Sequence, residues 1–176
     1  MNQELKYFRI RKVKSPNRAH PLDAGIDFYV PEDLTSDIMK EKINVTGCNI
    51  AIDFGSDGFV KSFRLKPNES VLIPSGIKMN VPEGYMLQYT NKSGIASKRG
   101  LLVGACVVDS GYMGECHIDL HNVSNREQTI NAGDKIVQGI LIPIASGECN
   151  EVEDESSLFD SSSSRGSGGF GSSGTK

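Results

Sequence analysis

A short stretch near the middle of the chain combines one carboxylate with one aromatic ring. Residues 107 to 115 read Val-Val-Asp-Ser-Gly-Tyr-Met-Gly-Glu, with apolar residues before them and an alternating run after them. This pattern predicts two strands joined by a tight turn, in which Gly111 and Gly114 supply backbone freedom. Asp109 at the strand end is placed to act as a general base. A turn-capping role is the plainer interpretation, and this stretch alone leaves both open.

A second stretch gathers positive charge in an otherwise acidic chain. Asn91-Lys92-Ser93-Gly94 is followed by Ile95-Ala96 and then by Ser97-Lys98-Arg99-Gly100. Ammonium groups, hydroxyls and the free N–H groups of a glycine-containing loop together favour an anion site. A solvated basic loop is the alternative interpretation.

The C-terminal residues form a third candidate. Arg165 is followed by glycines and serines around a single aromatic ring, in Phe170-Gly171-Ser172-Ser173. Free N–H groups, hydroxyls and a guanidinium can cradle a phosphate, and a ring in such a tail can stack on a flat ligand for roughly 1–3 kcal/mol. The segment is not a Walker A loop, because Thr175-Lys176 reverses the required order and no helix follows. An inert tail and an RNA-contacting Arg-Gly segment are the alternatives.

Two further groups are weaker. His117, Asp119 and His121 alternate along a predicted strand, which allows a metal-binding face. They are more simply the polar side of a half-buried strand whose Cys116, Ile118 and Leu120 face the core. Gly133-Asp134-Lys135 is most simply a turn, with Gln138 at the surface of the strand that follows.

The elements that carry these residues are predicted to be strands. Apolar runs recur about every ten residues with Gly, Pro, Asn or Ser between them, which indicates an all-β sandwich or barrel. A hairpin is expected around Gly55-Ser56-Asp57-Gly58, turns are expected at Pro74-Ser75-Gly76 and Pro82-Glu83-Gly84, and residues 33 to 42 allow one or two helical turns. We expect a β-rich domain over residues 1–145. Residues 146–176 are acidic and serine-rich, then glycine-rich, and are predicted to form a flexible arm.

Composition excludes several classes of protein. With 38% hydrophobic and 23% charged residues, the 176-residue chain has an ordinary globular composition. No apolar segment approaches the ~20 residues of a membrane helix, and the N-terminus lacks the pattern of a secretory signal. The 4 cysteines form no C-x-x-C pair, which fits reduced thiols and a cytoplasmic protein. A net charge of −3 gives no global attraction to nucleic acid.

Taken together and in order, these segments resemble the motifs of the trimeric deoxyuridine triphosphatases (dUTPases). The segments are Ala24-Gly25-Ile26-Asp27, residues 91–98, residues 108–115, residues 133–138, and Arg165-Gly166 with residues 169–174. Extra length over residues 36–62, expected to include the β-hairpin, is similar to the added segment of staphylococcal phage dUTPases. Members of that subgroup also act as regulatory ligands of a repressor protein.

The resemblance implies a jelly-roll-like β fold in a homotrimer, with each active site built from all three chains. The implied reaction is hydrolysis of dUTP to dUMP and pyrophosphate with Mg²⁺. Asp109 would be the base that activates water for attack on the α-phosphorus, and Tyr112 would pack under the deoxyribose and exclude a 2′-hydroxyl. Other implied roles are uracil reading by the backbone of Cys106, Val107 and Val108 and near His117, phosphate binding by Lys92, Ser93, Gly94 and Gln138, contact with Mg²⁺ through water by Asp27, and closure over the substrate by Arg165, Phe170, Gly171, Ser172 and Ser173.

Two positions depart from the family pattern. Lys92 stands where arginine is usual, so bidentate contacts are not available there. Gly111 stands where an aspartate is common. Two other functions stay open, a related dCTP deaminase and a protein-binding module on the same fold. The Tyr112 motif and the complete Arg165–Gly174 segment argue against the deaminase.

Overall fold

The structure is a computed structural model that describes residues 4–46, 50–159 and 166–168. Two compact units are present, residues Met1–Ala145 and residues Ser146–Lys176. The first unit contains nearly all of the regular structure. Its elements are β1 (Lys6–Arg9), β2 (Ile26–Tyr29), α1 (Ser36–Thr46), β3 (Ala51–Phe54), β4 (Val60–Leu65), β5 (Ser70–Asn80), β6 (Tyr85–Asn91), α2 (Ser93–Arg99), β7 (Leu101–Val103), β8 (Val107–Asp109), β9 (Glu115–Asn122), β10 (Gln128–Asn131) and β11 (Lys135–Pro143).

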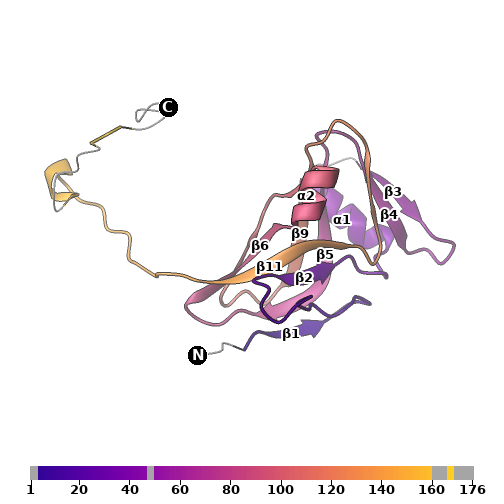
Figure 1. Ribbon diagram of the computed structural model, residues 1–176, viewed down its shortest axis with the longest axis horizontal. Coiled ribbons are helices and arrows are strands. Elements are labelled where there is room, and N and C mark those ends of the chain that lie inside the picture. The colour runs from indigo at the N-terminus through magenta and orange to yellow at the C-terminus, as the bar shows by residue number, and fades with distance from the viewer. Residues whose placement is uncertain (1–3, 47–49, 160–165, 169–176) are drawn as a thin grey trace. The chain divides into compact units, whose positions relative to one another are not determined.

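The strands of the first unit form three antiparallel sheets, so the predicted all-β, jelly-roll-like class is confirmed. Their orders are β1-β5-β9-β7, β10-β4-β3 and β2-β11-β6-β8 (Figure 1). Apart from β3 and β4, strands that are neighbours in a sheet are not consecutive in the chain. The sheet β2-β11-β6-β8 therefore contains parts of three candidate segments, which are residues 24–27, 107–109 and 133–138.

The core lies between the sheets and follows the alternation seen in the sequence. Along β9, Cys116, Ile118 and Leu120 are buried, and the residues between them are only partly buried. The interpretation of His117, Asp119 and His121 as the polar side of this strand agrees with that pattern. The rings of Phe28 and Tyr89 meet edge to face with centroids 4.9 Å apart, which locks β2 to β6 across β11.

The two strands and the turn predicted around Asp109 are present, but the strands do not pair with each other. Strand β8 pairs with β6, whereas β9 pairs with β5 and β7, so the turn at residues 109–115 crosses from one sheet to another. The apolar run from Leu101 to Val108 is likewise two strands in two sheets. The break falls at Gly104, where a Cβ would lie 2.3 Å from the carboxylate of Asp119. The same carboxylate accepts a hydrogen bond from Ala105 N–H at 2.9 Å, which ends β7.

The turn expected at Pro74-Ser75-Gly76 is also absent, because one continuous strand, β5, runs through these residues. The register with β9 shifts between Pro74 and Lys78, so the segment is a bulge. Gly76 has φ +72°, the left-handed conformation that a bulge needs and that glycine adopts without strain. Its N–H donates to the Glu115 side chain at 2.8 Å in place of a strand partner.

Residues 36–62 contain both the predicted hairpin and a helix. Helix α1 begins at Ser36, and β3 and β4 follow as an antiparallel pair, seen beside α1 in Figure 1. The residues expected as a basic loop after Lys92 form a second helix, α2, which ends at Gly100 with φ 63°. Among the described residues, no helix is long and apolar enough to cross a membrane.

The second unit has little regular structure in its described residues. One 3-10 turn covers Glu155–Ser157, and Asp154 caps it by accepting a hydrogen bond from Ser156 N–H at 2.9 Å. The predicted flexibility of this arm stays a prediction.

Candidate active site

Asp109 ends β8 and opens a four-residue turn. The Tyr112 N–H donates to the Asp109 carbonyl at 3.3 Å, which closes the turn over Ser110 and Gly111. Gly111 has φ +82°, the value that the third residue of a type II turn takes. The carboxylate of Asp109 is exposed. Gly111 therefore has a conformational reason to differ from the family's usual aspartate, and the turn presents Asp109 to incoming solvent or substrate.

The ring of Tyr112 folds back over the turn. Its hydroxyl donates to the Glu115 carbonyl at 3.1 Å. A Cβ on Gly114 would lie 2.3 Å from that hydroxyl oxygen, so the ring occupies the space that any larger residue at 114 needs. Almost half of the side chain, 46%, remains exposed. The hydroxyl end of the ring is thus held against the protein, and the exposed part of the side chain is available to a ligand.

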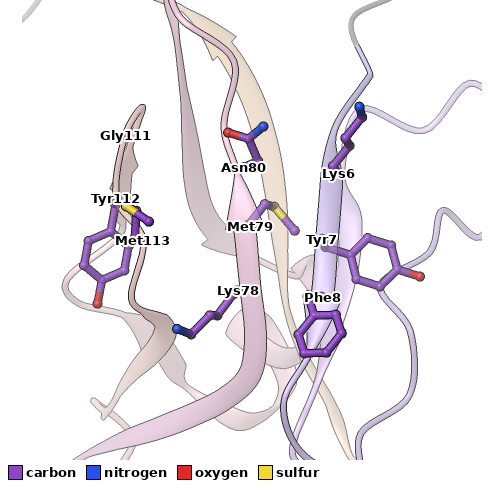
Figure 2. Close-up of a pocket in the computed structure, with 9 residues that line it drawn as sticks. All are labelled: Lys6, Tyr7, Phe8, Lys78, Met79, Asn80, Gly111, Tyr112 and Met113. Atoms are coloured by element: carbon purple, nitrogen blue, oxygen red, sulfur yellow. The ribbon is translucent and has the colours of Figure 1, made fainter.

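Tyr112 also forms one wall of a surface groove of about 410 Å³. Figure 2 shows Tyr112 and Met113 on one side, Tyr7 and Phe8 on the other, and Met79 of β5 between them. The Lys78 ammonium points toward the Tyr112 side of the groove in the same view. The exposed part of Tyr112 is therefore bordered by apolar surface and positive charge.

The three residues predicted to read a base lie on or beside β8, next to Asp109. Val108 is buried, whereas Val107 is 51% exposed and Cys106 is half-buried. The Cys106 carbonyl accepts a hydrogen bond from Tyr89 N–H at 2.7 Å, and the Cys106 Sγ accepts from Gln88 Nε2 at 3.8 Å. These contacts tie the segment to β6.

His117 lies outside the turn, in β9, where its register partner is Pro74 of β5. Its Nε2 is buried and has no hydrogen-bond partner. Burial lowers the pKa of His117, and the positive charges of Lys42 in α1 and of Arg11 lower it further, against the opposing effect of Glu115. His117 is therefore a half-buried ring whose surroundings favour the neutral form. Asp119 and His121 pair with each other at 3.2 Å, and no group of three metal-ligating side chains occurs among the described residues.

A second cluster forms around the buried carboxylate of Asp27 on β2. The Lys92 ammonium contacts one carboxylate oxygen, and the Lys135 ammonium lies 2.8 Å from the other. Burial on its own would raise the pKa of Asp27, but the two lysines outweigh it and the pKa is lowered. Asp27 raises the pKa of Lys135 in turn. The cluster carries two positive charges against one negative charge and suits an anionic ligand.

Gln138 belongs to the same cluster. It pairs with Asp27 in the register of β11 and β2, and its Nε2 donates to the Asn91 carbonyl at 3.0 Å. A Cβ on Gly25 would lie 2.1 Å from the Gln138 Oε1, so glycine at 25 makes room for this side chain. Three of the predicted segments therefore meet at one point through Gly25, Asn91 and Gln138.

Ser93 and Gly94 open α2 beside Lys92 and are both exposed. No atom lies within 4 Å of the position that a Cβ on Gly94 would take. Open space in front of their backbone is what a phosphate-binding role requires. Arg165, Phe170, Gly171, Ser172 and Ser173 lie outside the residues that the structure describes.

Comparison with known proteins decides the family. A sequence model of the dUTPase family matches residues 59–174. The chain belongs to the dUTPase family. Among curated relatives, the deoxyuridine 5′-triphosphate nucleotidohydrolase of Finegoldia magna is 44% identical over 112 residues, which are 62% of this chain and 75% of the relative. The enzyme of the same name from Fusobacterium nucleatum is 39% identical over 116 residues, or 65% and 76% of the two chains. As a dUTPase, the protein is an enzyme that hydrolyses dUTP.

Solved phage dUTPases match almost the whole length of the chain. A dUTPase of Staphylococcus bacteriophage 80alpha with dUPNHPP is 25% identical with a TM-score of 0.73, over 98% of this chain and 99% of that one. The dUTPase of phage phi11 of S. aureus, described with a species-specific insert, is 22% identical with a TM-score of 0.66, over 89% and 100%. The resemblance to the staphylococcal phage group is thus confirmed.

The two clusters of this dUTPase lie at opposite ends of β6. Asp109 pairs with Met86 near the start of the strand, and Gln138 pairs with Thr90 near its end, on the other side of β6. Four residues along a strand and two strand spacings correspond to a separation of about 16 Å between their backbones. The fold therefore assembles Asp109 with Tyr112, and Asp27 with Lys92 and Gln138, but holds the two groups apart within one chain.

The structure of this dUTPase shows contacts of residues to which the sequence had assigned no functional role. Lys135 had been read as part of a simple turn, and only the two-sided pairing of Asp27 reveals its charge in the cluster. Arg11 and Glu115 form a partly buried bidentate ion pair, with each of the two N···O distances at 2.8 Å. They are 104 residues apart, so no local signal connects them.

Proposed function

We propose that the protein hydrolyses dUTP to dUMP and pyrophosphate, with Asp109 as the general base that activates water for attack on the α-phosphorus. A carboxylate has a reference pKa of ~3.9, so it is ionised at neutral pH and can accept a proton from water. Tyr112 packs its exposed part against the deoxyribose and leaves no room for a 2′-hydroxyl. The backbone of Cys106, Val107 and Val108 contacts the uracil edge. The backbone near His117 in β9 contributes to the same recognition.

The phosphates are bound by the second cluster. Lys92 and Gln138 contact phosphate oxygens together with the backbone of Ser93 and Gly94. Lys135 supplies a further positive charge at the same point. The single lysine at 92 gives a point-charge contact where an arginine would give a bidentate one.

The observation that carries this proposal is the separation of about 16 Å between Asp109 and Gln138 along the pairing of β8, β6 and β11. A base and its water must come within a few ångströms of the α-phosphate, and Gln138 is proposed to contact that same phosphate. Asp109 and Gln138 of one site therefore come from different copies of the chain. A homotrimer with cyclic symmetry supplies that arrangement in each of its interfaces.

Mg²⁺ is the cofactor of the reaction, and a phi11 phage dUTPase is described with a structural Mg(II) ion. The described residues fit an ion carried by the triphosphate rather than one held by the protein, because they offer no group of three ligating side chains. Mg²⁺ prefers phosphate oxygens and water, and it neutralises phosphate charge. Asp27 would contact the hydrated ion through water, and Lys92 and Lys135 beside it would be available to the phosphates.

The C-terminal arm completes the site in this proposal. Arg165, Ser172 and Ser173 close over the γ-phosphate, Phe170 stacks on the uracil, and Gly171 allows close approach of the backbone. Such closure shields the reaction from bulk water and leaves the attacking water in place.

The decisive test is pyrophosphate release measured in parallel with dUTP, UTP, dTTP and dCTP. The proposal expects turnover of dUTP at least ~10²-fold above that of the other three, the scale at which a pocket rejects an analogue with one added hydroxyl. Ammonia release from dCTP would instead identify a deaminase.

A second, regulatory function is favoured by the segment over residues 36–62. The β3–β4 hairpin presents two aromatic side chains to solvent, Phe54 at 42% and Phe59 at 37% exposure. A staphylococcal phage dUTPase is described as controlling transfer of virulence genes. We propose that this segment binds a repressor protein. Replacing Phe54 and Phe59 by serine should weaken repressor binding and spare dUTP hydrolysis, and unchanged binding would contradict the role.

A further inference from the structure

The Glu115 side chain is the centre of a clamp that joins three distant parts of the chain. Its two oxygens accept hydrogen bonds from Arg11 Nε and an Arg11 terminal nitrogen, each at 2.8 Å. One of the same oxygens accepts from Gly76 N–H at 2.8 Å. The clamp therefore connects the segment after β1, the bulge of β5 and the first residue of β9.

The clamp is partly buried and charged. The side chains of Arg11 and Glu115 are only 19% and 11% exposed. Burial would raise the pKa of Glu115, but Arg11 and the Gly76 N–H reverse this and lower it. The pKa of Arg11 is raised, above all by the Glu115 hydrogen bond. A bidentate guanidinium–carboxylate pair of this kind fixes direction as well as distance.

The backbone of Glu115 contacts Tyr112. The backbone carbonyl of Glu115 accepts the Tyr112 hydroxyl at 3.1 Å, and the ring lies over Gly114 immediately before it. A shift of the Glu115 backbone therefore moves the tyrosine ring. The side chain and the carbonyl of one residue thus link the partly buried ion pair to the exposed wall of the groove in Figure 2.

We propose that Arg11 and Glu115 are positioning residues for Tyr112, and that they set how strongly the enzyme discriminates dUTP from UTP. This inference rests on the proposed function, in which Tyr112 contacts the sugar. Neither residue touches the reacting atoms. Loosening the clamp affects the placement of the ring, and small misplacements of a substrate-positioning group can cost up to ~10² in rate.

The test measures kcat and KM for dUTP and for UTP in Arg11→Lys and Glu115→Gln, with the melting temperature of each variant. Lysine cannot make the bidentate contact, so the ratio of kcat/KM for dUTP over UTP should fall about tenfold. Glutamine keeps an acceptor for Gly76 N–H and for one Arg11 nitrogen, so Glu115→Gln should lose less. Arg64→Lys is the matched control. Arg64 also makes a two-point contact with a carboxylate, that of Asp53, with N···O distances of 2.9 and 3.3 Å, and neither residue lines the groove.

Tyr112→Ala separates failure of the inference from failure of the function it rests on. A ratio that falls in Tyr112→Ala and in Arg11→Lys, but not in Arg64→Lys, supports the clamp. A fall in Tyr112→Ala with no change in folded Arg11→Lys and Glu115→Gln overturns the clamp alone. An unchanged ratio in Tyr112→Ala overturns the sugar-reading role and the clamp with it. If Arg11→Lys does not fold, the result with Glu115→Gln decides.

Discussion

Gly114 lies directly under the ring of Tyr112, so that a Cβ at residue 114 would come within 2.3 Å of the tyrosine hydroxyl oxygen. This close approach explains why residue 114 is a glycine, and Tyr112 remains 46% exposed. It also suggests a way to displace the ring without touching it.

Gly114→Ala should move the ring, because a side chain swings aside more easily than the backbone. We expect the kcat/KM ratio for dUTP over UTP to fall about tenfold, with little change in melting temperature. Steady-state kinetics with both nucleotides measures this. Gly147→Ala is the control, since a Cβ there would meet no atom within 4 Å and the backbone of Gly147 is not in the left-handed region. Equal ratios in both variants would show that the ring's position is irrelevant to sugar choice.

Asp109→Asn keeps the shape of the side chain and removes its ability to accept a proton. Turnover of dUTP should fall at least ~10²-fold, equivalent to ~2.7 kcal/mol of barrier. Single-turnover pyrophosphate release reports this step. Asp57→Asn is a matched control, because Asp57 is also a turn carboxylate, accepting from Phe59 N–H at 3.2 Å. Turnover near that of the wild type in Asp109→Asn would leave Asp109 only as a turn residue.

Asp27→Asn tests the predicted contact with hydrated Mg²⁺. Loss of an outer-shell carboxylate typically costs 10–100-fold in metal affinity. The Mg²⁺ concentration for half-maximal dUTP hydrolysis should therefore rise by about tenfold. Asp53→Asn, which removes a carboxylate paired with Arg64, serves as the control. An unchanged Mg²⁺ curve with weaker dUTP binding would mean that Asp27 only orients Lys92 and Lys135.

The charge of Glu115 makes stability depend on pH in a defined direction. Its pKa in the folded protein lies below the ordinary value of 4.5. The ionised group therefore stabilises the fold above that value, and this contribution is lost as the pH falls through the folded pKa. The difference in free energy of unfolding between wild type and Glu115→Gln should be largest near pH 7 and shrink below 4.5. Urea titrations at fixed protein concentration measure it, and a difference independent of pH would contradict the ion pair.

Local patterns in the sequence predicted the strands well because alternation of buried and exposed residues is a property of neighbours. The residues around Ile118 and the hairpin of β3 and β4 are examples. The partners of each strand are set by contacts far along the chain, so the separate sheets of β8 and β9 were missed. The Arg11–Glu115 pair was missed for the same reason.

In the candidate site, too, local motifs were recognised and contacts between distant residues were missed. The order of the motifs pointed to Asp109, Tyr112, Lys92 and Gln138. The fold brings Asp109 close to Tyr112 and Lys92 close to Gln138. Lys135 was missed because a lysine after Gly-Asp reads locally as a turn. The helix after Lys92 was missed because it is short and contains Gly94, a residue that disfavours helix.

The most direct test of this account is complementation between two inactive variants. Asp109→Asn and Gln138→Ala are co-expressed in equal amounts, purified together, and assayed for pyrophosphate release from dUTP. If each site takes Asp109 from one copy and Gln138 from another, random assembly restores about one quarter of the sites, and with them about one quarter of wild-type activity. Activity no higher than that of the separate variants would contradict a site shared between copies.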